Sequence, residues 1–373
     1  MIAFLLVAAL AASDTVGAAD TTRARRDTTT TRRDSVPTRV AFGAFVDGYY
    51  AWDTGRPRAF DRLYTTQPAR HNEFNVNLAF VEAVLTGDRV RGRLALQAGT
   101  SVQSNYFAEP RVGAVSGGEL SRNIQEATVG VRLGRGLWLD GGIYFSYIGF
   151  EGWISRDNPT YTRSLVADFT PYYLSGAKLT WQASRTISAQ LHVMNGWQNV
   201  SETNADKAVG TRIDWTPRRD VVLAWGTFIG NEQPDSLAAR TRILNQFLAR
   251  WTPTDWELSA VLDLGRQSRP GNGADTWSGS TVIARRALTP TVKLVGRAEY
   301  LFDRGQVLVR TDSPGGFRTT GASLGLDVQP DARVLWRTEV RGFRSRDAIW
   351  PRAGAASGNR TSAVLVSSLA LTL

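Results

Sequence analysis

Two absences limit what this chain can be. Its 373 residues include no cysteine, so no disulfide framework supports the fold; this suits an oxidising compartment without establishing one. No segment reaches the roughly 18 consecutive apolar residues that a transmembrane helix requires. A membrane protein with such a sequence must therefore be a β-barrel or lie on the membrane surface.

Histidine is scarce, which bears on enzyme and metal chemistry. The chain has two histidines, His71 and His192, and neither lies in a nucleophile motif. Because histidine is the usual general base, this argues against the main rival class, an enzyme in a barrel wall. His71 and Glu73 have no third metal ligand at a useful spacing. Hydrogen bonding in a loop and in the lumen accounts for both histidines, and we expect no cofactor and no metal.

The N-terminal region indicates export. Ile2–Ala12 form an apolar run that small residues follow, ending at Ala18 and Ala19. This predicts a signal peptide over residues 1–19, although its basic start is lacking and a buried N-terminal helix is the alternative. Residues 20–39 are rich in arginine and threonine and have hardly any large apolar side chain. They predict a disordered basic linker, with contact to an anionic envelope polymer or lipid as the sharper alternative.

The basic residues are almost all arginine. Lysine occurs only at Lys178, Lys207 and Lys293 among 44 basic residues, and the net charge is +10. Such a charge ordinarily raises the question of nucleic-acid binding. An exported chain rarely meets that ligand, so we expect no nucleic-acid partner.

Most of the chain alternates between apolar and polar residues with a period of two. In residues 89–100 the apolar set Val90, Leu94, Leu96 and Ala98 alternates with the polar set Arg89, Arg91, Arg93 and Gln97. An arginine at every second position can sit in a membrane strand only if that face meets water. About sixteen such stretches occur, and no helical segment could cover them. The pattern predicts an all-β transmembrane antiparallel barrel over residues 40–373; fourteen or eighteen strands stay open because residues 281–287 alternate poorly.

Turn and aromatic placement support a barrel with two different ends. Seven short turns rich in Pro, Gly and Asp alternate with eight long polar gaps, one of them at 266–276. This predicts short periplasmic turns, long extracellular loops and periplasmic termini. In the strand that begins at residue 74, the apolar face is predicted to hold Phe74, Val76, Leu78 and Phe80. Two aromatic girdles are predicted, one from Trp181, Trp215, Trp251, Trp256 and Trp336, the other from Tyr50, Trp52, Tyr173 and Tyr300.

Several segments resemble outer-membrane β-barrel porins of the OmpL-like type. They are RHNEFNVNLAFVEA (70–83), RGRLALQAGTSVQSNYFAEP (91–110), residues 137–181, NGWQ (195–198) and TFIGNE (227–232). The resemblance covers residues 40–373 and implies an outer-membrane barrel and, by analogy, a diffusion channel. It supplies no catalytic residues.

Strand parity predicts which charges face the lumen. The predicted pore-lining residues are Arg91, Arg93, Arg132, Lys178, Arg212, Arg297, Arg337, Glu339 and Arg341. With Arg250 and Lys293 the lumen bases number ten, against seven acids: Glu126, Asp140, Asp214, Glu257, Asp263, Glu299 and Glu339. The excess of three bases predicts a weak anion preference. Most of these charges should pair across strands, and salt screens the rest.

The longest gap, residues 147–171, is called loop 3 here. It contains Glu151, Arg156, Asp157, Arg163 and Asp168 among aromatic and apolar residues. Those apolar side chains favour packing against the barrel interior, so we predict a constriction loop; a surface-exposed loop is the alternative. Its net charge of −1 lowers the lumen excess to about +2.

The sequence therefore predicts an outer-membrane porin that passes small hydrophilic solutes by passive diffusion. Its partners would be outer-membrane lipid and these solutes, and a homo-oligomer is left open. Two other functions remain. A substrate-specific channel would show a ladder of aligned aromatic side chains in the lumen, and a structural or adhesive barrel would have a plugged lumen.

Overall fold

A computed structural model of the chain describes residues 37–353 and 358–373. The predicted signal peptide (1–19) and the predicted linker up to residue 36 lie outside the described residues. The barrel begins at Arg39, one residue before the predicted start.

The described residues form sixteen strands and a few short helices. The strands are β1 (Arg39–Asp53), β2 (Phe74–Thr86), β3 (Val90–Ala98), β4 (Ile124–Gly134), β5 (Leu137–Phe145), β6 (Tyr173–Gln182), β7 (Ile187–Met194), β8 (Ala208–Arg218), β9 (Val221–Asn231), β10 (Thr241–Trp251), β11 (Trp256–Ser268), β12 (Ala274–Ala287), β13 (Val292–Asp303), β14 (Phe317–Asp331), β15 (Val334–Ser345) and β16 (Thr361–Thr372). The helices are α2 (Thr100–Asn105), α3 (Gly118–Ser121), η1 (Ser155–Asp157) and α4 (Leu165–Asp168).

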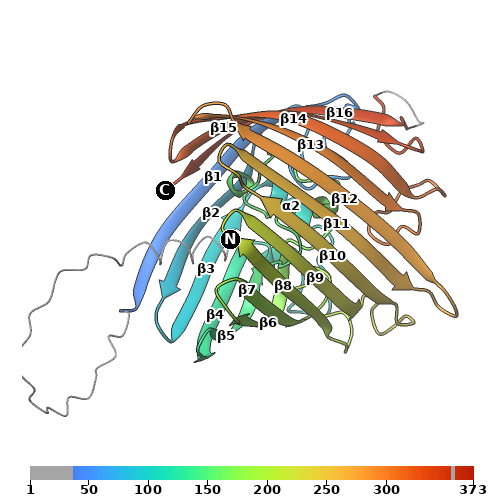
Figure 1. Cartoon of the computed structure of the whole chain (residues 1–373). Helices are drawn as coiled ribbons and strands as arrows, with labels where there is room; N and C mark the ends of the chain where they lie inside the picture. Colours follow the sequence, from blue (N-terminus) through green and yellow to red (C-terminus); the bar gives the residue numbers. More distant parts are fainter. Residues whose placement is uncertain (1–36, 354–357) are drawn as a thin grey trace, which may run out of the picture. The chain divides into compact units, whose positions relative to one another are not determined.

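Each strand pairs antiparallel with its neighbours in sequence, and the sheet closes on itself (Figure 1). The closing pair is β1 with β16, in which Tyr49 lies opposite Ser368. Closure pairs the backbone groups that would otherwise lie along a free edge. The prediction of an all-β antiparallel barrel of about sixteen strands is confirmed.

β12 is a regular strand despite its poor alternation. Residues 281–286 pair with β11 on one side, and residues 281–287 pair with β13 on the other. The alternation is weak because Arg286 points outward near a short turn, where its guanidinium lies 5.3 Å from the centre of the Trp256 ring. An arginine close to the end of a strand can reach the interface in this way.

One long gap is shorter than predicted. The sequence predicted a gap at 266–276, but β11 continues to Ser268, which pairs with Ala274 of β12. Only residues 269–273 connect the two strands. Polar residues at the extracellular ends of β11 and β12 still take part in the strand pairing. The change from apolar to polar residues therefore placed the ends of these two strands too early.

Side chains alternate between the two faces of the wall as the pattern predicted for most strands. Leu94 is 53% exposed on the outside, whereas the neighbouring Arg93 points inward. The tryptophans near the short turns, Trp181, Trp215, Trp251, Trp256 and Trp336, all lie on the outer surface. Tyr173, predicted for the other girdle, is instead fully buried and stacks on Tyr106, with ring centres 4.3 Å apart.

A β-bulge changes the facing within β2. Asp47 of β1 pairs with Leu78 and Gly48 pairs with Val76, so Asn77 is the extra residue. Because a bulge shifts the alternation by one residue, Phe74 and Val76 point outward whereas Leu78 points inward. The prediction of a single apolar face along β2 was therefore wrong beyond Val76.

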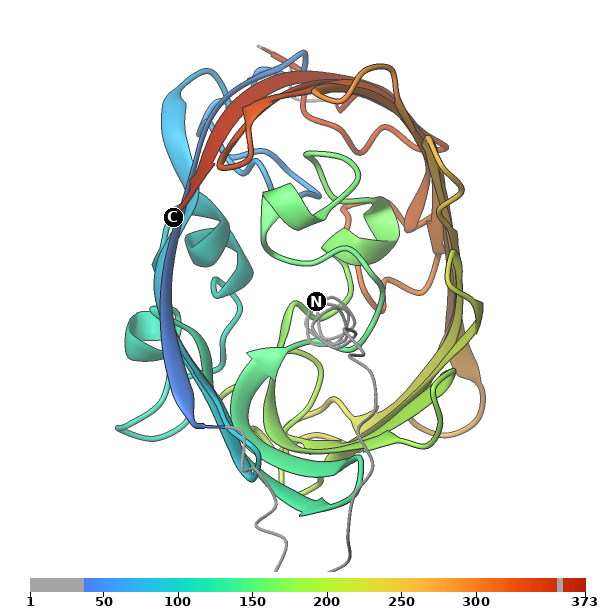
Figure 2. The ribbon, with the colours of Figure 1, turned by 60° about the vertical axis from the view of Figure 1, so that its left-hand side comes forward.

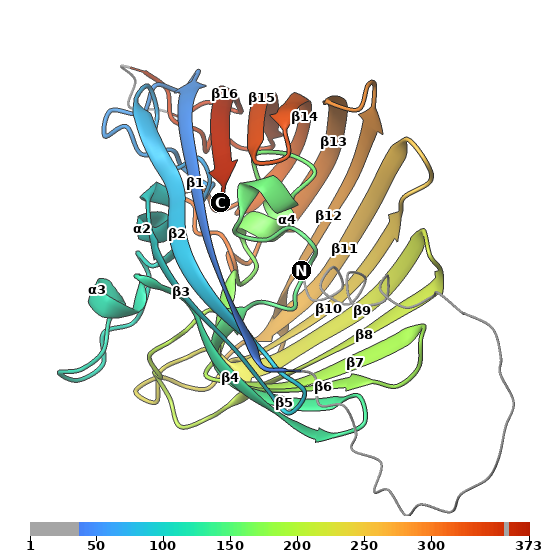
Figure 3. The ribbon, with the colours of Figure 1, turned by 90° about the vertical axis from the view of Figure 1, so that its left-hand side faces the viewer.

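The helices are short and lie at the long-loop connections. α2 follows β3 and contacts β2, whereas α3 lies farther out, away from the strands (Figure 3). α4 lies within the ring of strands. None of the helices in the described residues has the length and apolar character needed to cross a membrane.

Candidate functional site

Loop 3 folds back into the barrel. It leaves the end of β5, crosses the space that the ring of strands encloses and returns to β6 (Figure 2). Trp153, Tyr161 and Leu165 of this loop are each no more than 2% exposed. A loop extended from the barrel end would leave such side chains in water. The barrel interior is therefore the candidate functional site, with loop 3 as its main internal feature.

The tip of loop 3 is hydrogen-bonded to β15. The Arg337 guanidinium donates to the backbone carbonyls of Ser155 and Asn158 at 2.7 and 2.8 Å. The Glu339 carboxylate accepts from the Thr162 N–H at 2.8 Å and from its hydroxyl at 2.9 Å. The Asn158 carbonyl and the Thr162 N–H have no backbone hydrogen-bond partner within the described residues, so these contacts satisfy both groups.

A second anchor holds the α4 segment. Glu299 of β13 accepts a hydrogen bond from the Leu165 N–H at 2.7 Å, and Arg341 of β15 donates to the same carboxylate at 2.8 and 2.9 Å. Arg341 also lies 3.7 Å from Asp168. Burial raises the pKa of Asp168, while the Arg341 charge opposes that shift. The guanidinium thus favours the ionised form of a carboxylate that is removed from water.

Arg297 of β13 joins the two anchors. Its guanidinium donates to the Thr160 hydroxyl at 2.8 Å, lies 3.1 Å from Glu339, and lies 3.9 Å from Glu151 at the root of the loop. Burial raises the pKa of Glu151, and the nearby Arg297 charge opposes the shift. Loop 3 is therefore bound to β13 and β15 by a buried network of charged hydrogen bonds.

Two wall glycines, on β8 and β12, make room for the loop. A Cβ on Gly210 of β8 would overlap the hydroxyl of Tyr147, and one on Gly279 of β12 would lie 2.5 Å from a methyl of Val166. Val166 packs with Leu248 of β10 as well. Loop 3 therefore also contacts the wall formed by β8–β12.

The predicted constriction residues divide by exposure. Glu151, Arg163 and Asp168 are buried in the contacts between the loop and the wall, whereas Arg156 and Asp157 at the tip remain accessible to solvent. Arg163 binds within the loop, donating to backbone carbonyls such as that of Trp153 at 2.7 Å. Three of the five residues thus hold the loop in position. Of the other two, Arg156 donates to the Ala332 carbonyl of a short turn at 2.7 Å, and Asp157 is exposed.

The predicted pore-lining residues also divide into two groups. Arg297, Arg337, Glu339 and Arg341 point inward but are covered by loop 3, and Lys178 is buried beside the Tyr144 ring. The remaining four, Arg91, Arg93, Arg132 and Arg212, keep part of their surface in contact with solvent. Among the inward bases of the strands, a permeating solute can meet only this second group and Arg242, Arg250, Arg285 and Lys293.

Parity reasoning missed several inward charges. They are the bases Arg242 and Arg285 and the acids Asp47, Asp53, Glu82, Asp275, Asp303 and Asp327. Arg285 lies in the strand with poor alternation, and Glu82 lies beyond the bulge in β2. Extending the parity count to the strand ends would have found Asp53, Asp275 and Asp303.

With these residues, inward strand positions carry twelve bases and thirteen acids. The charged residues of the short turns are not included in these numbers. The predicted excess of three bases was therefore wrong as a total.

Exposure separates the two signs of charge. Eight of these twelve bases remain at least partly exposed, compared with four of the thirteen acids. A guanidinium reaches farther from its strand than a carboxylate, so it can pair with a wall acid and still face water. In the pair of Arg91 with Asp140, for example, the side chains are 32% and 6% exposed. The accessible part of the interior is therefore enriched in positive charge.

The two histidines are held in hydrogen bonds. His71 Nδ1 accepts from the Asp53 N–H at 2.9 Å, and His192 Nδ1 lies 3.2 Å from the Tyr144 hydroxyl. No group of three potential metal ligands occurs among the residues that the structure describes.

The interior aromatic residues are packed together rather than aligned along water. Tyr106, Trp153 and Tyr173 stack with ring centres 4.3–6.0 Å apart, and each is no more than 4% exposed. They fill the contact between α2, loop 3 and β6. This cluster does not have the form of the exposed ladder that a substrate-specific channel would require.

Residues 39–373 match the family described as "Putative beta-barrel porin-2, OmpL-like". The chain belongs to this porin family.

Solved porins and channels share the fold. The anion-selective porin from Comamonas acidovorans has a TM-score of 0.58 at 10% identity, covering 90% of this chain and 100% of that one. The outer membrane channel DcaP of Acinetobacter baumannii gives 0.60 at 10% identity, with coverage of 90% and 97%. OmpT of Vibrio cholerae in its trimer form gives 0.57 at 10% identity, with coverage of 90% and 99%. Among curated proteins, no sequence matches this chain.

Family and fold together place this porin in the bacterial outer membrane. Both are those of channels rather than enzymes. The short turns accordingly face the periplasm and the long loops face the cell exterior. The outer wall is apolar, and loop 3 lies in an interior whose accessible strand charges are mostly basic.

Proposed function

We propose that this porin passes small hydrophilic solutes by passive diffusion and weakly prefers anions. The water path would run beside loop 3, along the strands whose arginines keep contact with solvent. The observation that carries the proposal is the exposure difference between inward bases and inward acids. Charges nearest the water dominate the field that a permeating ion meets, because buried pairs are neutralised locally.

A basic cluster near the periplasmic end supports this preference. Glu257 of β11 accepts hydrogen bonds from both Arg250 and Arg285, so two guanidiniums share one carboxylate. Lys293 of β13 lies opposite Asp327 in the register, but Asp327 already accepts two hydrogen bonds from a β15 arginine. Within the described residues, Lys293 forms no ion pair of its own. The cluster therefore carries more positive than negative charge where the lumen opens to the periplasm.

The test is the reversal potential of the refolded protein in a planar bilayer under a KCl gradient. We expect a small potential of anion-selective sign that grows at low ionic strength, because screening weakens. Lys293→Gln should reduce it and Glu257→Gln should increase it. Lys207→Gln serves as the control, since Lys207 lies in an extracellular loop and pairs with Glu202. A cation-selective sign in the unaltered protein would overturn the proposed preference.

A plugged barrel is the second candidate function, because the buried network fixes loop 3 inside the lumen. It differs from a diffusion channel in one measurable respect, the absence of ion conduction.

Self-association is part of the proposal as well. The likeness to OmpT in its trimer form supports a homo-oligomer in the membrane. Cross-linking of the protein in detergent tests this, and a monomer throughout would contradict it.

A further inference from the structure

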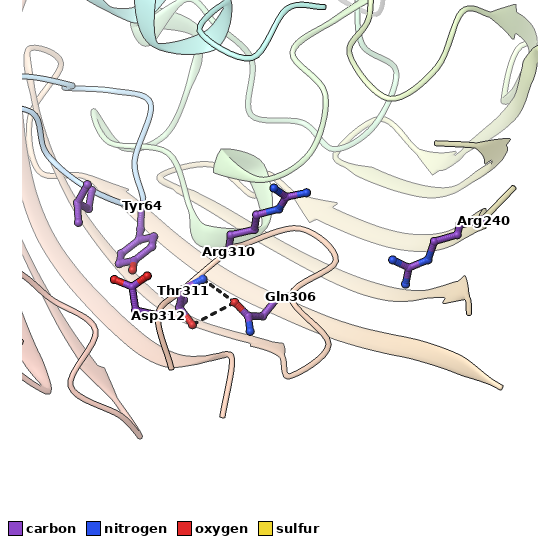
Figure 4. Close-up of a pocket in the computed structure, with 7 residues that line it drawn as sticks. Tyr64, Arg240, Gln306, Arg310, Thr311 and Asp312 are labelled. Carbon is purple, nitrogen blue, oxygen red and sulfur yellow. Dashed lines mark hydrogen bonds between the residues drawn. The ribbon is translucent and has the colours of Figure 1, made fainter. Parts of the chain in front are cut away.

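A cavity of about 650 Å³ lies among the extracellular loops (Figure 4). Tyr64 lines it from the loop between β1 and β2, and Arg240 lines it from the residue before β10. Its remaining wall is the segment between β13 and β14, through Gln306, Arg310 and Asp312. The volume falls within the range of small-molecule sites. None of the residues that line the cavity is one of the inward strand charges that support the anion preference.

The loop that carries Arg310 is held in a fixed shape. The Asp303 carboxylate accepts from the N–H groups of Val307, Leu308 and Val309 at 2.7–2.9 Å. The Gln306 side-chain oxygen accepts from the Thr311 N–H at 2.7 Å. Four of the five backbone N–H groups in residues 307–311 are thus held by side chains from the end of β13 and the start of this loop, so binding there would require little ordering of the backbone.

The cavity has an excess of arginine. Arg240 donates to Asp275 at 2.9 Å, and Arg269 donates to the same carboxylate at 2.8 Å, so one acid neutralises two guanidiniums only partly. Arg310 is exposed and forms no ion pair within residues 37–353 and 358–373. Asp312 is the one acid among the lining residues. An anionic group would therefore find a free guanidinium in Arg310 and a second partly compensated one in Arg240.

The opposite side of the cavity is aromatic and rigid. The Tyr64 ring makes edge contacts with Phe317 and Trp350, each with ring centres 5.3 Å apart. Leu63 lies beside it. This side offers an apolar surface that is already ordered before any ligand arrives.

We propose that this cavity binds small organic carboxylates, with Arg310 and Arg240 holding the carboxylate and Tyr64 contacting the apolar part. Its role as the extracellular capture site of a channel rests on the function proposed above. The binding itself requires no conduction. This arrangement would concentrate such solutes at the entrance of the water path.

Calorimetric titration of the folded full-length protein in detergent tests the site, with benzoate as the probe and benzamide as its uncharged counterpart. We expect benzoate to bind more tightly than benzamide. Arg310→Gln should weaken benzoate binding by about tenfold or more, because a charge-assisted hydrogen bond is lost. Arg304→Gln is the matched control, since Arg304 is an exposed arginine of the same loop that does not line the cavity.

Equal benzoate affinity in the two variants, or no benzoate binding to the unaltered protein, would overturn the site. Tyr64→Leu should weaken benzoate and benzamide alike. Circular dichroism of each variant establishes that the barrel has folded. If benzoate binds as expected but bilayers show no conduction, the channel function fails and the site stands. If conduction is normal and Arg310→Gln changes nothing, the site fails and the channel function stands.

Discussion

At the residue scale, the buried charges that hold loop 3 are tolerated because they pair with charges of opposite sign. Arg341 is the clearest case: its guanidinium is fully buried between Glu299 and Asp168, and both of these carboxylates are buried as well. Removing one partner from such a set leaves an uncompensated charge, which costs more than the intact set contributes.

We expect Arg341→Met to lower the free energy of unfolding by about 3–5 kcal/mol. The measurement is the urea unfolding midpoint of the refolded protein. Arg333→Met is the control, because Arg333 is exposed at a periplasmic turn. Equal stability of the two variants would show that the Glu299 network does not hold the barrel and loop 3 together.

The facing of β3 gives a second prediction. Leu94→Arg places a charge in the lipid near mid-membrane and should cost about 2–4 kcal/mol. Arg91→Leu, on the inner face of the same strand, should cost less than Leu94→Arg, because the Arg91 side chain is 32% exposed and water partly screens its ion pair with Asp140. The same unfolding assay compares them. Arg93 also faces inward, but it forms ion pairs with both Glu82 and Glu126, so its replacement would remove the ion-pair partner of two carboxylates. Similar losses in Leu94→Arg and Arg91→Leu would mean that the register of β3 is wrong.

At the element scale, the strands were predictable and their irregularities were not. Alternation in residues 89–100 predicted the register and facing of β3 because the signal is local and has a fixed period. The bulge at Asn77 interrupts that period without a marking glycine or proline, so Leu78 was assigned to the wrong face. Tyr173 was misplaced for a different reason: its position at a strand end fits a girdle, but loop 3 and α2 cover it.

Loop 3 shows the same limit. Its apolar content predicted an inward position, but its partners could not be read from the sequence. The Leu165 contact with Glu299 joins residues 134 apart in the chain, and the Ser155 contact with Arg337 joins residues 182 apart. No local pattern records such pairs. The charge count failed for a related reason, since parity gives the facing of a side chain and not its exposure.

Shortening loop 3 should open the interior without unfolding the barrel. The Ser164 N–H donates to Glu151 at 3.0 Å, so the two sides of the loop already meet there. A Gly-Ser linker can therefore replace residues 152–163. We expect a higher single-channel conductance and an unchanged strand spectrum by circular dichroism, because the strand ladder does not depend on the tip. Unchanged conductance would mean that the tip does not narrow the path.

At the scale of the whole molecule, a closed wall with an apolar exterior surrounds an interior into which loop 3 folds. The inward acids are mostly buried and the inward bases are mostly accessible, so the barrel interior combines near-balanced numbers of inward bases and acids with a basic water-facing surface. A diffusion channel and a plugged barrel both fit the strand architecture. They differ in whether a continuous water path remains.

The proposed function requires a continuous water path through the barrel. Single-channel recording in a planar bilayer with symmetric KCl tests for this path most directly. The account predicts discrete current steps when the refolded, unaltered protein is added, with a conductance that rises with salt concentration, as expected of a water-filled path. A barrel that inserts, shows its strand spectrum in vesicles and yet passes no current at any salt concentration would contradict it.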